Sequence, residues 1–290
     1  MSQFKSVVLA ATLAVATTAT AKEGADQYPN GAEGFMAGAL PPPGTYFLNY
    51  AGYYSGDRYD SNGDKVKGVS VEAWFDAPRI VHVTQQQFLG ASYGFAALLP
   101  IVRQEISTPG GDELVTGIGD MSITPVLLGW HWPEFHMIAA LDIFAPTGTY
   151  DKNNPARSIG ANYWTFEPVL AFTYLNKQGW EASTKLMYSL RTENDATDYR
   201  SGNEFHMDYT LARHVGSWAF GLGGYYVKQV EEDELNGTRL RDSEGQVFAF
   251  GPQVKYDYKN MSFIGKWHHE TEVENRFGGD KLWFKFVMAF

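Results

Sequence analysis

Two residues that could begin a catalytic site lie close together in the second half of the chain. His206 and Asp208 are two positions apart in a stretch where apolar and polar residues alternate, so they share one face of a predicted strand. A carboxylate that orients a histidine is the beginning of a Ser-His-Asp triad. Because no serine stands out as the nucleophile, we interpret the two residues as a hydrogen-bonded pair in a polar interior, and we predict no catalytic residue.

Two other short motifs suggest chemistry but do not fit strand geometry. The run Gly-Ala-Ser-Tyr-Gly at 90–94 matches the G-x-S-x-G nucleophile elbow, but a strand pattern follows it where the elbow needs a helix. The run His268-His269-Glu270 has the residue types of a metal site. Adjacent residues on a strand point to opposite faces, so the two histidines cannot bind one ion without a bulge. We therefore predict no bound metal and no cofactor.

The elements that must position these residues repeat with period two. Between Trp180 and Arg191 mostly apolar residues alternate with mostly polar ones, and the pattern recurs at 204–211 and 246–258. Such segments are strands with one apolar and one polar face. About twelve of them occur, near 44–55, 69–85, 91–104, 118–130, 136–146, 161–175, 180–191, 203–214, 217–230, 246–258, 261–270 and 281–290.

Composition narrows the classes of protein that can carry this pattern. The chain has 290 residues, no cysteine, a formal net charge of -10 and 15% aromatic residues, and its mean hydropathy is -0.29. The lack of cysteine excludes disulfides and thiolate metal sites. The negative charge argues against a nucleic-acid partner, and the hydropathy excludes a bundle of membrane helices. The many aromatic residues fit a membrane barrel, where such residues collect at the two interfaces.

The spacing of the strands predicts an all-β fold, a transmembrane antiparallel up-and-down β-barrel of about 12 strands. Long polar connections at 56–68, 105–117, 147–160, 192–202, 231–245 and 271–280 alternate with short ones such as 176–179 and 259–260. Long extracellular loops and short periplasmic turns are typical of outer-membrane barrels. A soluble β-sandwich also alternates, and it is the alternative fold.

The last predicted strand has the most specific single feature. Apolar residues occupy every second position from Leu282 onward. This pattern resembles the assembly signal on the last strand of bacterial outer-membrane barrels, which implies the barrel assembly machinery and outer-membrane lipid as partners. The predicted signal consists of Phe284, Phe286, Met288 and Phe290.

Two segments precede the first strand. Residues 1–21 contain Lys5, an apolar run and the sequence Ala19-Thr20-Ala21, which is the pattern of a signal peptide with its cleavage site. Residues 22–43 are too short for a domain and too apolar for a free tail. We predict that they form a plug inside the barrel or, alternatively, a periplasmic arm. The barrel itself is predicted to cover residues 44–290.

The polar faces of the strands are predicted to point into the barrel. One region fits badly, because the alternation around Pro78 directs Arg79 towards lipid, where a charge near the midplane costs roughly 2–4 kcal/mol. A bulge at Pro78 would restore the register. The candidates for the lumen and the substrate path are Glu72, Glu167, Lys185, Arg191, Glu204, His206, Asp208, Lys255, Asp257, Lys266, His268 and Glu270.

Several turn and strand motifs together resemble one family. They are LPPPGTY at 40–46, GIGD at 117–120, APTGTY at 145–150, GYYVKQ at 224–229 and the pair Asn275-Arg276. These motifs resemble the family described as "Putative MetA-pathway of phenol degradation" over essentially the whole mature chain. The resemblance implies an outer-membrane barrel of Gram-negative bacteria, associated with the breakdown of phenols and other aromatic compounds and with their uptake. It implies no catalytic residue.

We therefore predict a monomeric outer-membrane channel for passive uptake of small hydrophobic or aromatic compounds such as phenols or hydrocarbons, and not an enzyme. The acidic run at 231–234 is predicted to disfavour anionic solutes. Two alternatives stay open. One is an outer-membrane hydrolase on a phospholipase-like barrel, which needs an exposed serine beside a histidine at the lipid boundary. The other is a structural barrel without transport.

Overall fold

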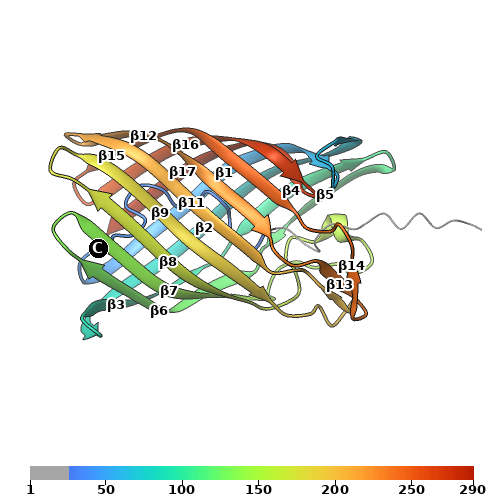
Figure 1. Ribbon diagram of the computed structural model, residues 1–290, viewed down its shortest axis with the longest axis horizontal. Coiled ribbons are helices and arrows are strands. Elements are labelled where there is room, and N and C mark those ends of the chain that lie inside the picture. Colours follow the sequence, from blue (N-terminus) through green and yellow to red (C-terminus); the bar gives the residue numbers. More distant parts are fainter. Residues whose placement is uncertain (1–25) are drawn as a thin grey trace, which may run out of the picture.

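The computed structural model describes residues 26–290, so the predicted signal peptide at 1–21 lies outside the described residues. Most of the described chain forms one antiparallel sheet that closes on itself (Figure 1). The sheet contains β1 (Gly44–Tyr59), β2 (Lys65–Phe88), β3 (Ala91–Leu98), β4 (Ile101–Thr108), β5 (Gly111–Ile118), β6 (Met121–His131), β7 (Phe135–Ala145), β8 (Thr165–Leu175), β9 (Trp180–Arg191), β11 (Glu204–Val215), β12 (Trp218–Gln229), β15 (Gln246–Tyr258), β16 (Met261–Glu274) and β17 (Phe277–Ala289). Outside it lie the 3-10 turn η1 (Pro155–Arg157) and a small sheet of β10 (Tyr199–Arg200), β13 (Asp233–Leu235) and β14 (Thr238–Leu240). None of the helices in this described part is long and apolar enough to cross a membrane.

The elements of the large sheet make the twelve strands of a barrel, as predicted, because two of the strands are interrupted. β3 and β4 pair end to end with β2 and are separated by Leu99-Pro100. β5 and β6 pair with β4 and β3 in the same way and are separated by Gly119-Asp120. Proline has no N–H to donate to a strand ladder, which accounts for the break at Pro100.

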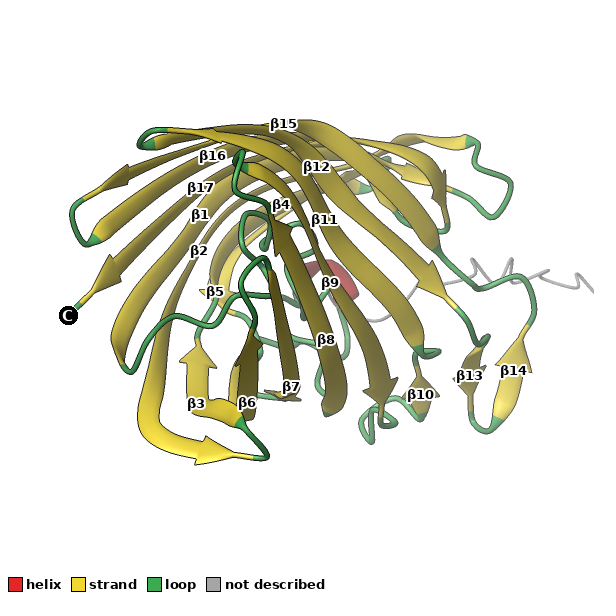
Figure 2. Ribbon diagram, turned by 60° about the vertical axis from the view of Figure 1, so that its left-hand side comes forward, coloured by secondary structure: helices red, strands yellow, loops and turns green. Residues whose placement is uncertain are grey.

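The first and last strands close the barrel. β1 pairs with β17 from Tyr46 opposite Ala289 onward, and it also pairs with β2. Closure satisfies backbone groups that an open sheet edge would leave unpaired in lipid. Figure 2 shows the sheet curving around loops that lie inside it.

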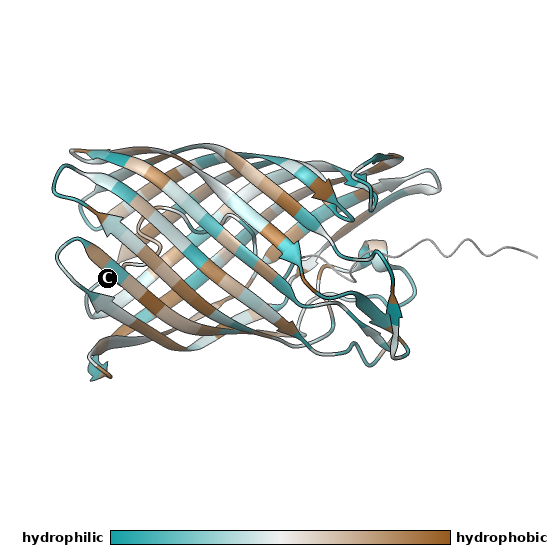
Figure 3. Ribbon diagram, viewed as in Figure 1, coloured by the Kyte–Doolittle hydropathy of each residue, from teal (hydrophilic) through white to brown (hydrophobic). Residues whose placement is uncertain are grey.

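The two faces of the strands differ as the period-two pattern predicts. On β17, Leu282 and Phe284 are about half exposed, whereas the residues that follow each of them, Trp283 and Lys285, are buried inside the barrel. Figure 3 shows hydrophobic and hydrophilic residues alternating along the strands, with further hydrophilic residues in the loops at both ends. An outward apolar face over every strand suits contact with lipid rather than water.

The two rims of the barrel differ in the length of their connections. At one rim, which we call the short-turn rim, strands are joined by residues 89–90, 132–134, 176–179, 216–217 and 259–260. At the other, the long-loop rim, residues 146–164, 192–203 and 230–245 form the long connections. The expected long loops at 56–68, 105–117 and 271–280 are mostly strand instead. Where both faces of a strand contact water, apolar and polar residues no longer alternate, although the backbone pairing continues. The strands predicted from the alternation were therefore too short.

The inner face of β2 is apolar, which corrects the predicted register. The β1–β2 pairing runs without a break from Gly44 opposite Val83 to Asp57 opposite Ser70, so no bulge lies at Pro78. The odd-numbered residues of β2 face inward, and Arg79 is therefore inside the barrel. Glu72, which was predicted to line the lumen, is exposed on the outside. The rule that polar residues point inward fails here because this part of the wall contacts an apolar segment, described below.

Candidate functional site

The interior of the barrel, which we call the lumen, contains residues 26–43, which we call the N-terminal segment. Tyr28, Ala32 and Leu40 of this segment are buried among inward-facing side chains of the wall. The segment runs from the long-loop rim, where Asp26 contacts the β16–β17 turn, to the start of β1 at the short-turn rim. It crosses the space through which any solute would have to pass.

At the long-loop rim the N-terminal segment is bound by charges. Arg276 in the β16–β17 turn forms ion pairs with Asp26 and with Glu204 of β11, and Arg191 of β9 pairs with Glu204 from the other side. Burial would lower the pKa of Arg276, but the charges of Asp26 and Glu204 outweigh it and raise that pKa. The guanidinium is thus a permanent charge that holds two carboxylates together.

Asp120 connects the N-terminal segment to the wall at the interruption between β5 and β6. Its carboxylate accepts hydrogen bonds from the side chain of Gln27 at 2.7 Å and from the backbone N–H groups of Gly148 and Ala161, both at 2.9 Å. Gly148 and Ala161 belong to the long loop that follows β7. One buried carboxylate therefore joins the segment, the loop and the broken strand.

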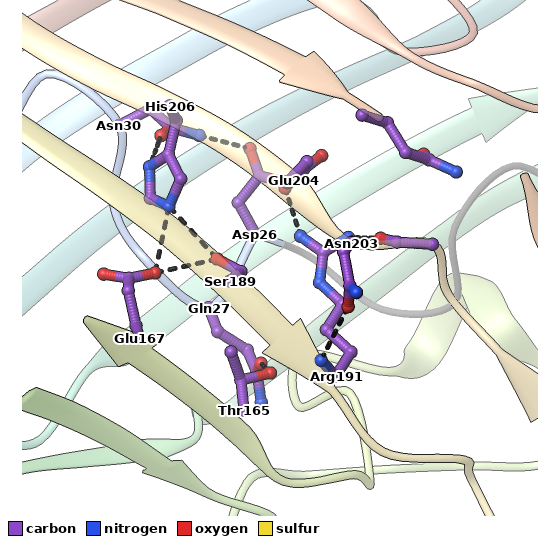
Figure 4. Close-up of polar contacts among 12 residues, drawn as sticks. Asp26, Gln27, Asn30, Thr165, Glu167, Ser189, Arg191, Asn203, Glu204 and His206 are labelled. Carbon is purple, nitrogen blue, oxygen red and sulfur yellow. Dashed lines mark hydrogen bonds and ion pairs between the residues drawn. The ribbon is translucent and has the colours of Figure 1, made fainter. Parts of the chain in front are cut away.

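A histidine, a serine and a glutamate meet in the lumen, but they are not arranged as a triad (Figure 4). The Nε2 atom of His206 lies 2.9 Å from Glu167 and 3.1 Å from the hydroxyl of Ser189. That hydroxyl also donates to Glu167 at 2.8 Å, and Nδ1 of His206 lies 3.0 Å from Asn30 of the N-terminal segment. In a triad the acid and the serine bind opposite ring nitrogens, whereas here both lie at Nε2.

The predicted pairing of His206 with Asp208 is wrong, although both residues are buried in the lumen. Asp208 binds the N-terminal segment instead, accepting hydrogen bonds from the Tyr28 hydroxyl at 2.6 Å, the Gly31 N–H at 2.8 Å and the Glu33 N–H at 3.0 Å. The ammonium of Lys266, on β16, donates to the carbonyl of Ala32 at 2.7 Å. The turn at 31–33 is thus held by an anion and a cation from different strands.

Glu33 places a negative charge at the centre of the lumen, between two cations. Its carboxylate lies 2.5 Å from the ammonium of Lys285 on β17 and 3.2 Å from the guanidinium of Arg79 on β2. The hydroxyl of Tyr50 on β1 donates to it at 2.8 Å. A buried charge is tolerated when it is paired and hydrogen-bonded in this way, so the segment supplies a counter-charge to two cations of the wall.

The lower part of the N-terminal segment, residues 36–43, is held without ion pairs. The Gly38 N–H donates to Thr173 at 2.9 Å, and the segment passes so close to β8 that a Cβ at Gly38 would lie 2.4 Å from the Phe172 carbonyl carbon. Leu40 then packs on Gly129 of β6. Around it lies an inner surface that we call the apolar wall, formed by Val81 and Val83 of β2, Ala96 of β3 and Leu127 of β6, with Leu48, Ile138 and Ala140 at its border.

Most of the residues predicted to line the lumen do face inward. Glu167, Lys185, Arg191, Glu204, His206, Asp208, Lys266, His268 and Glu270 are buried there. Lys255 and Asp257 form an ion pair of 2.9 Å near the short-turn rim, apart from the others. Glu72 is the exception, as described above. Five charged residues of the lumen were not predicted, although the parity that sends Phe284 outward could have found the two lysines of β17. They are Glu33, Arg79, Asp142, Lys281 and Lys285.

The comparisons with known proteins agree with this architecture. Residues 55–286 match the family model described as "Putative MetA-pathway of phenol degradation". The chain belongs to this family. Taken with the closed barrel and its apolar exterior, membership identifies it as a β-barrel of the outer membrane. No curated protein is significantly similar to it in sequence.

Solved structures show the same fold at low sequence identity. The COG4313 outer membrane channel from Pseudomonas putida F1 is 19% identical, with a TM-score of 0.78 over 88% of this chain and 98% of that one. The transport unit of the autotransporter AIDA-I from Escherichia coli is 10% identical, with a TM-score of 0.51 over 85% of this chain and 90% of that one. This member of the phenol-degradation family thus has the fold of an outer-membrane channel, with the long-loop rim outside the cell and the short-turn rim in the periplasm.

Proposed function

We propose that the barrel is a monomeric channel for passive uptake of small hydrophobic or aromatic compounds. The observation that carries the proposal is the apolar wall, because water-filled barrels have a polar interior. An apolar layer of Ala77, Leu98, Phe144 and Val169 lies at the level of Tyr28 and shares the border residues Leu48 and Ala140 with the apolar wall. A solute that loses little on leaving water can follow such a surface, whereas a sugar cannot.

The N-terminal segment is, in this proposal, a plug with a movable lower part. The upper part is anchored to charged groups at Asp26, Asp208 and Glu33. The lower part, residues 36–43, packs on the apolar wall through Leu40, and its backbone N–H groups at Met36 and Gly38 donate to Glu181 of β9 and Thr173 of β8. Displacing Leu40 exposes apolar surface that an apolar solute covers again. Solute and segment then compete for one surface, and entry needs no energy source.

The first test is entry of solutes into liposomes that contain the mature chain. Phenol or toluene, a fatty acid and a small sugar are compared with liposomes that lack protein. We expect faster entry of the aromatic solute and no faster entry of the sugar. Equal acceleration of the sugar would indicate a general pore, and no acceleration of any solute would favour a structural barrel.

The extracellular charges give a second prediction, because Arg200 neutralises part of the acidic run at 231–234. Its guanidinium lies 2.8 Å from Glu234 and 3.3 Å from Glu231, and its charge lowers the pKa of Glu234. Replacing Arg200 with glutamine should slow the entry of benzoate relative to benzyl alcohol, since a more negative loop repels the anion. The control is Lys177→Gln, which removes one positive charge from an exposed turn at the opposite, short-turn rim. An unchanged ratio in Arg200→Gln would argue against electrostatic selection by this loop.

Assembly gives a third prediction. Phe290 is exposed at 76%, and its backbone N–H donates to the carbonyl of Thr45 at 3.0 Å, which extends the seam between β17 and β1. Deleting Phe290 should reduce insertion by the assembly machinery, seen as less heat-modifiable folded barrel in outer-membrane fractions. Phe277→Ala at the other end of β17 is the control. Equal insertion of the unaltered chain, the chain without Phe290 and Phe277→Ala would refute a role of Phe290 in assembly.

Among residues 26–290, no observation favours the hydrolase alternative. Ser189 is buried in the lumen rather than exposed at the lipid boundary, and its hydroxyl donates to Glu167. A serine behind a filled lumen lacks the access to substrate that acyl transfer needs.

A further inference from the structure

The histidines of this chain can be sorted by which of them can share a ligand. There are seven, all within the described residues. His268 and His269 are adjacent on β16 and face opposite sides, with His268 buried and His269 bound to Asp280. His131 and His136 are five residues apart, but they are directly opposite each other in the β6–β7 ladder. The strand geometry that separates the adjacent pair therefore brings this cross-strand pair together.

The two imidazoles of His131 and His136 point at each other. Their Nδ1 atoms are 2.9 Å apart, and the ring centroids are 5.1 Å apart with the planes tilted by 60°. No further hydrogen-bond partner of either ring is found in the described part of the chain. Glu134, in the turn between them, is engaged elsewhere, because it accepts hydrogen bonds from the Tyr174 hydroxyl and the Lys177 N–H.

The pair lies on the inner face of the barrel at its periplasmic end. His136 is opposite Thr173, which is fully buried in the lumen, so both side chains of the pair face inward. His131 is exposed, so the pair is open to the periplasm. On β6 the next inward position above His131 is Gly129, where Leu40 packs.

The two Nδ1 atoms are as close together as two ligands of one metal ion, although the rings face nearly head-on and must turn before both lone pairs can meet at the ion. With metal–nitrogen bonds of about 2.0–2.1 Å, two ligands at a right angle are about 2.9 Å apart, and two tetrahedral ligands about 3.3 Å apart. Right-angle ligation by nitrogen is the preference of Cu²⁺ and Ni²⁺, and Cu²⁺ binds imidazole most tightly among the common divalent metals. Among the described residues no third histidine or carboxylate joins the pair, so water would fill the other positions.

We propose that His131 and His136 form a two-histidine site for a divalent transition metal at the periplasmic mouth of the barrel, and that Cu²⁺ is the metal that binds most tightly. For this the rings turn so that both Nδ1 lone pairs meet at the ion, and the histidine that carried the shared proton on Nδ1 carries it on Nε2 instead. The ion links the ends of β6 and β7 directly below the Leu40 contact. The site lies beside the periplasmic exit of the solute path proposed above, but its test measures metal binding and not transport, so the two proposals stand or fall separately.

The test is Cu²⁺ binding by the full mature chain in detergent, purified without a polyhistidine tag. Titration should give one tight site, and the electron paramagnetic resonance spectrum should show two equivalent nitrogen ligands. His131→Asn and His136→Asn should each weaken binding at least about tenfold, the lower limit for losing even an indirect metal contact. The control is His269→Asn, which alters an exposed histidine outside the site and should bind like the unaltered chain.

The heat-modifiable mobility of each variant establishes that the barrel is folded, so a loss of binding is not a loss of fold. Wild-type binding by His131→Asn and His136→Asn, a spectrum with a single nitrogen, or no stoichiometric site in the unaltered chain would each overturn the proposal. The last result would mean that the 2.9 Å contact is an N–H···N hydrogen bond only.

Discussion

Replacing Glu33 with alanine is expected to release the N-terminal segment from the middle of the barrel. The substitution leaves Lys285 and Arg79 buried without the carboxylate that pairs with both, and it removes the acceptor of the Tyr50 hydroxyl. Removing one partner of a buried ion pair costs about 3–5 kcal/mol, because the remaining charge is uncompensated. The segment loses its central attachment, and we expect a lower unfolding temperature and several-fold faster entry of small solutes, sugars included, into liposomes.

A second variant separates loss of the plug from loss of the fold. Glu33→Leu combined with Arg79→Met and Lys285→Met removes all three charges, and replacing a buried ionic cluster by apolar residues is often neutral for stability. This chain should regain much of the lost unfolding temperature. Glu72→Ala, on the outer surface, is the matched control for removing a glutamate. If sugar entry in Glu33→Ala equals that of the control, the ion pairs at Glu33 do not hold the plug.

The second large effect is expected at Gly129, where the lower part of the segment lies on the apolar wall. A Cβ at this position would be 2.5 Å from the Cβ of Leu40, closer than two carbon atoms can approach. Gly129→Ala should therefore push Leu40 off the wall, at a cost of about 1–3 kcal/mol for overpacking. Because the upper attachments remain, we expect faster entry of aromatic solutes with little change for sugars.

A compensating change tests the cause of that effect. Gly129→Ala with Leu40→Gly removes the clashing Cβ, so the strain should disappear while the apolar wall stays uncovered. The double variant should thus be more stable than Gly129→Ala and equally permeable to phenol. Gly265→Ala on β16 is the control glycine, because its added Cβ would meet only Val254, at 3.7 Å. If phenol enters equally fast through the control and through Gly129→Ala, the contact of Leu40 with the apolar wall does not limit transport.

The sequence predicts the barrel well because the outer face of every strand contacts the same environment, the lipid of the membrane. Contact with lipid favours an apolar residue at every second position of a strand. Leu282, Phe284 and Phe286 follow this pattern. The inner face has no such uniform neighbour. On β2 the inner neighbour is Leu40, so Val81 and Val83 point inward, and the same rule assigns Glu72 to the wrong face.

The candidate site could be predicted only in part, because its contacts join residues that are far apart in the chain. Parity puts His206 and Asp208 on one face, but residues two apart on a strand are about 6.6 Å apart, and each reaches a different part of the segment. His206 meets Asn30, and Asp208 meets Gly31. No local pattern specifies which residue of a segment without regular structure lies opposite which strand. Glu33, the residue that joins β2 and β17, was missed for this reason.

The most direct test of the account is solute entry through a barrel whose apolar wall has been made polar without a change of shape. Val81→Thr with Val83→Thr adds two hydroxyl groups to that wall, and Thr210→Val makes the opposite change on the polar side, where Thr210 is buried beside Gln253. The account predicts that phenol entry into liposomes falls several-fold in the threonine variant and stays unchanged in Thr210→Val. Equal phenol entry in the folded threonine variant and the unaltered chain would contradict the claim that aromatic solutes cross along this wall.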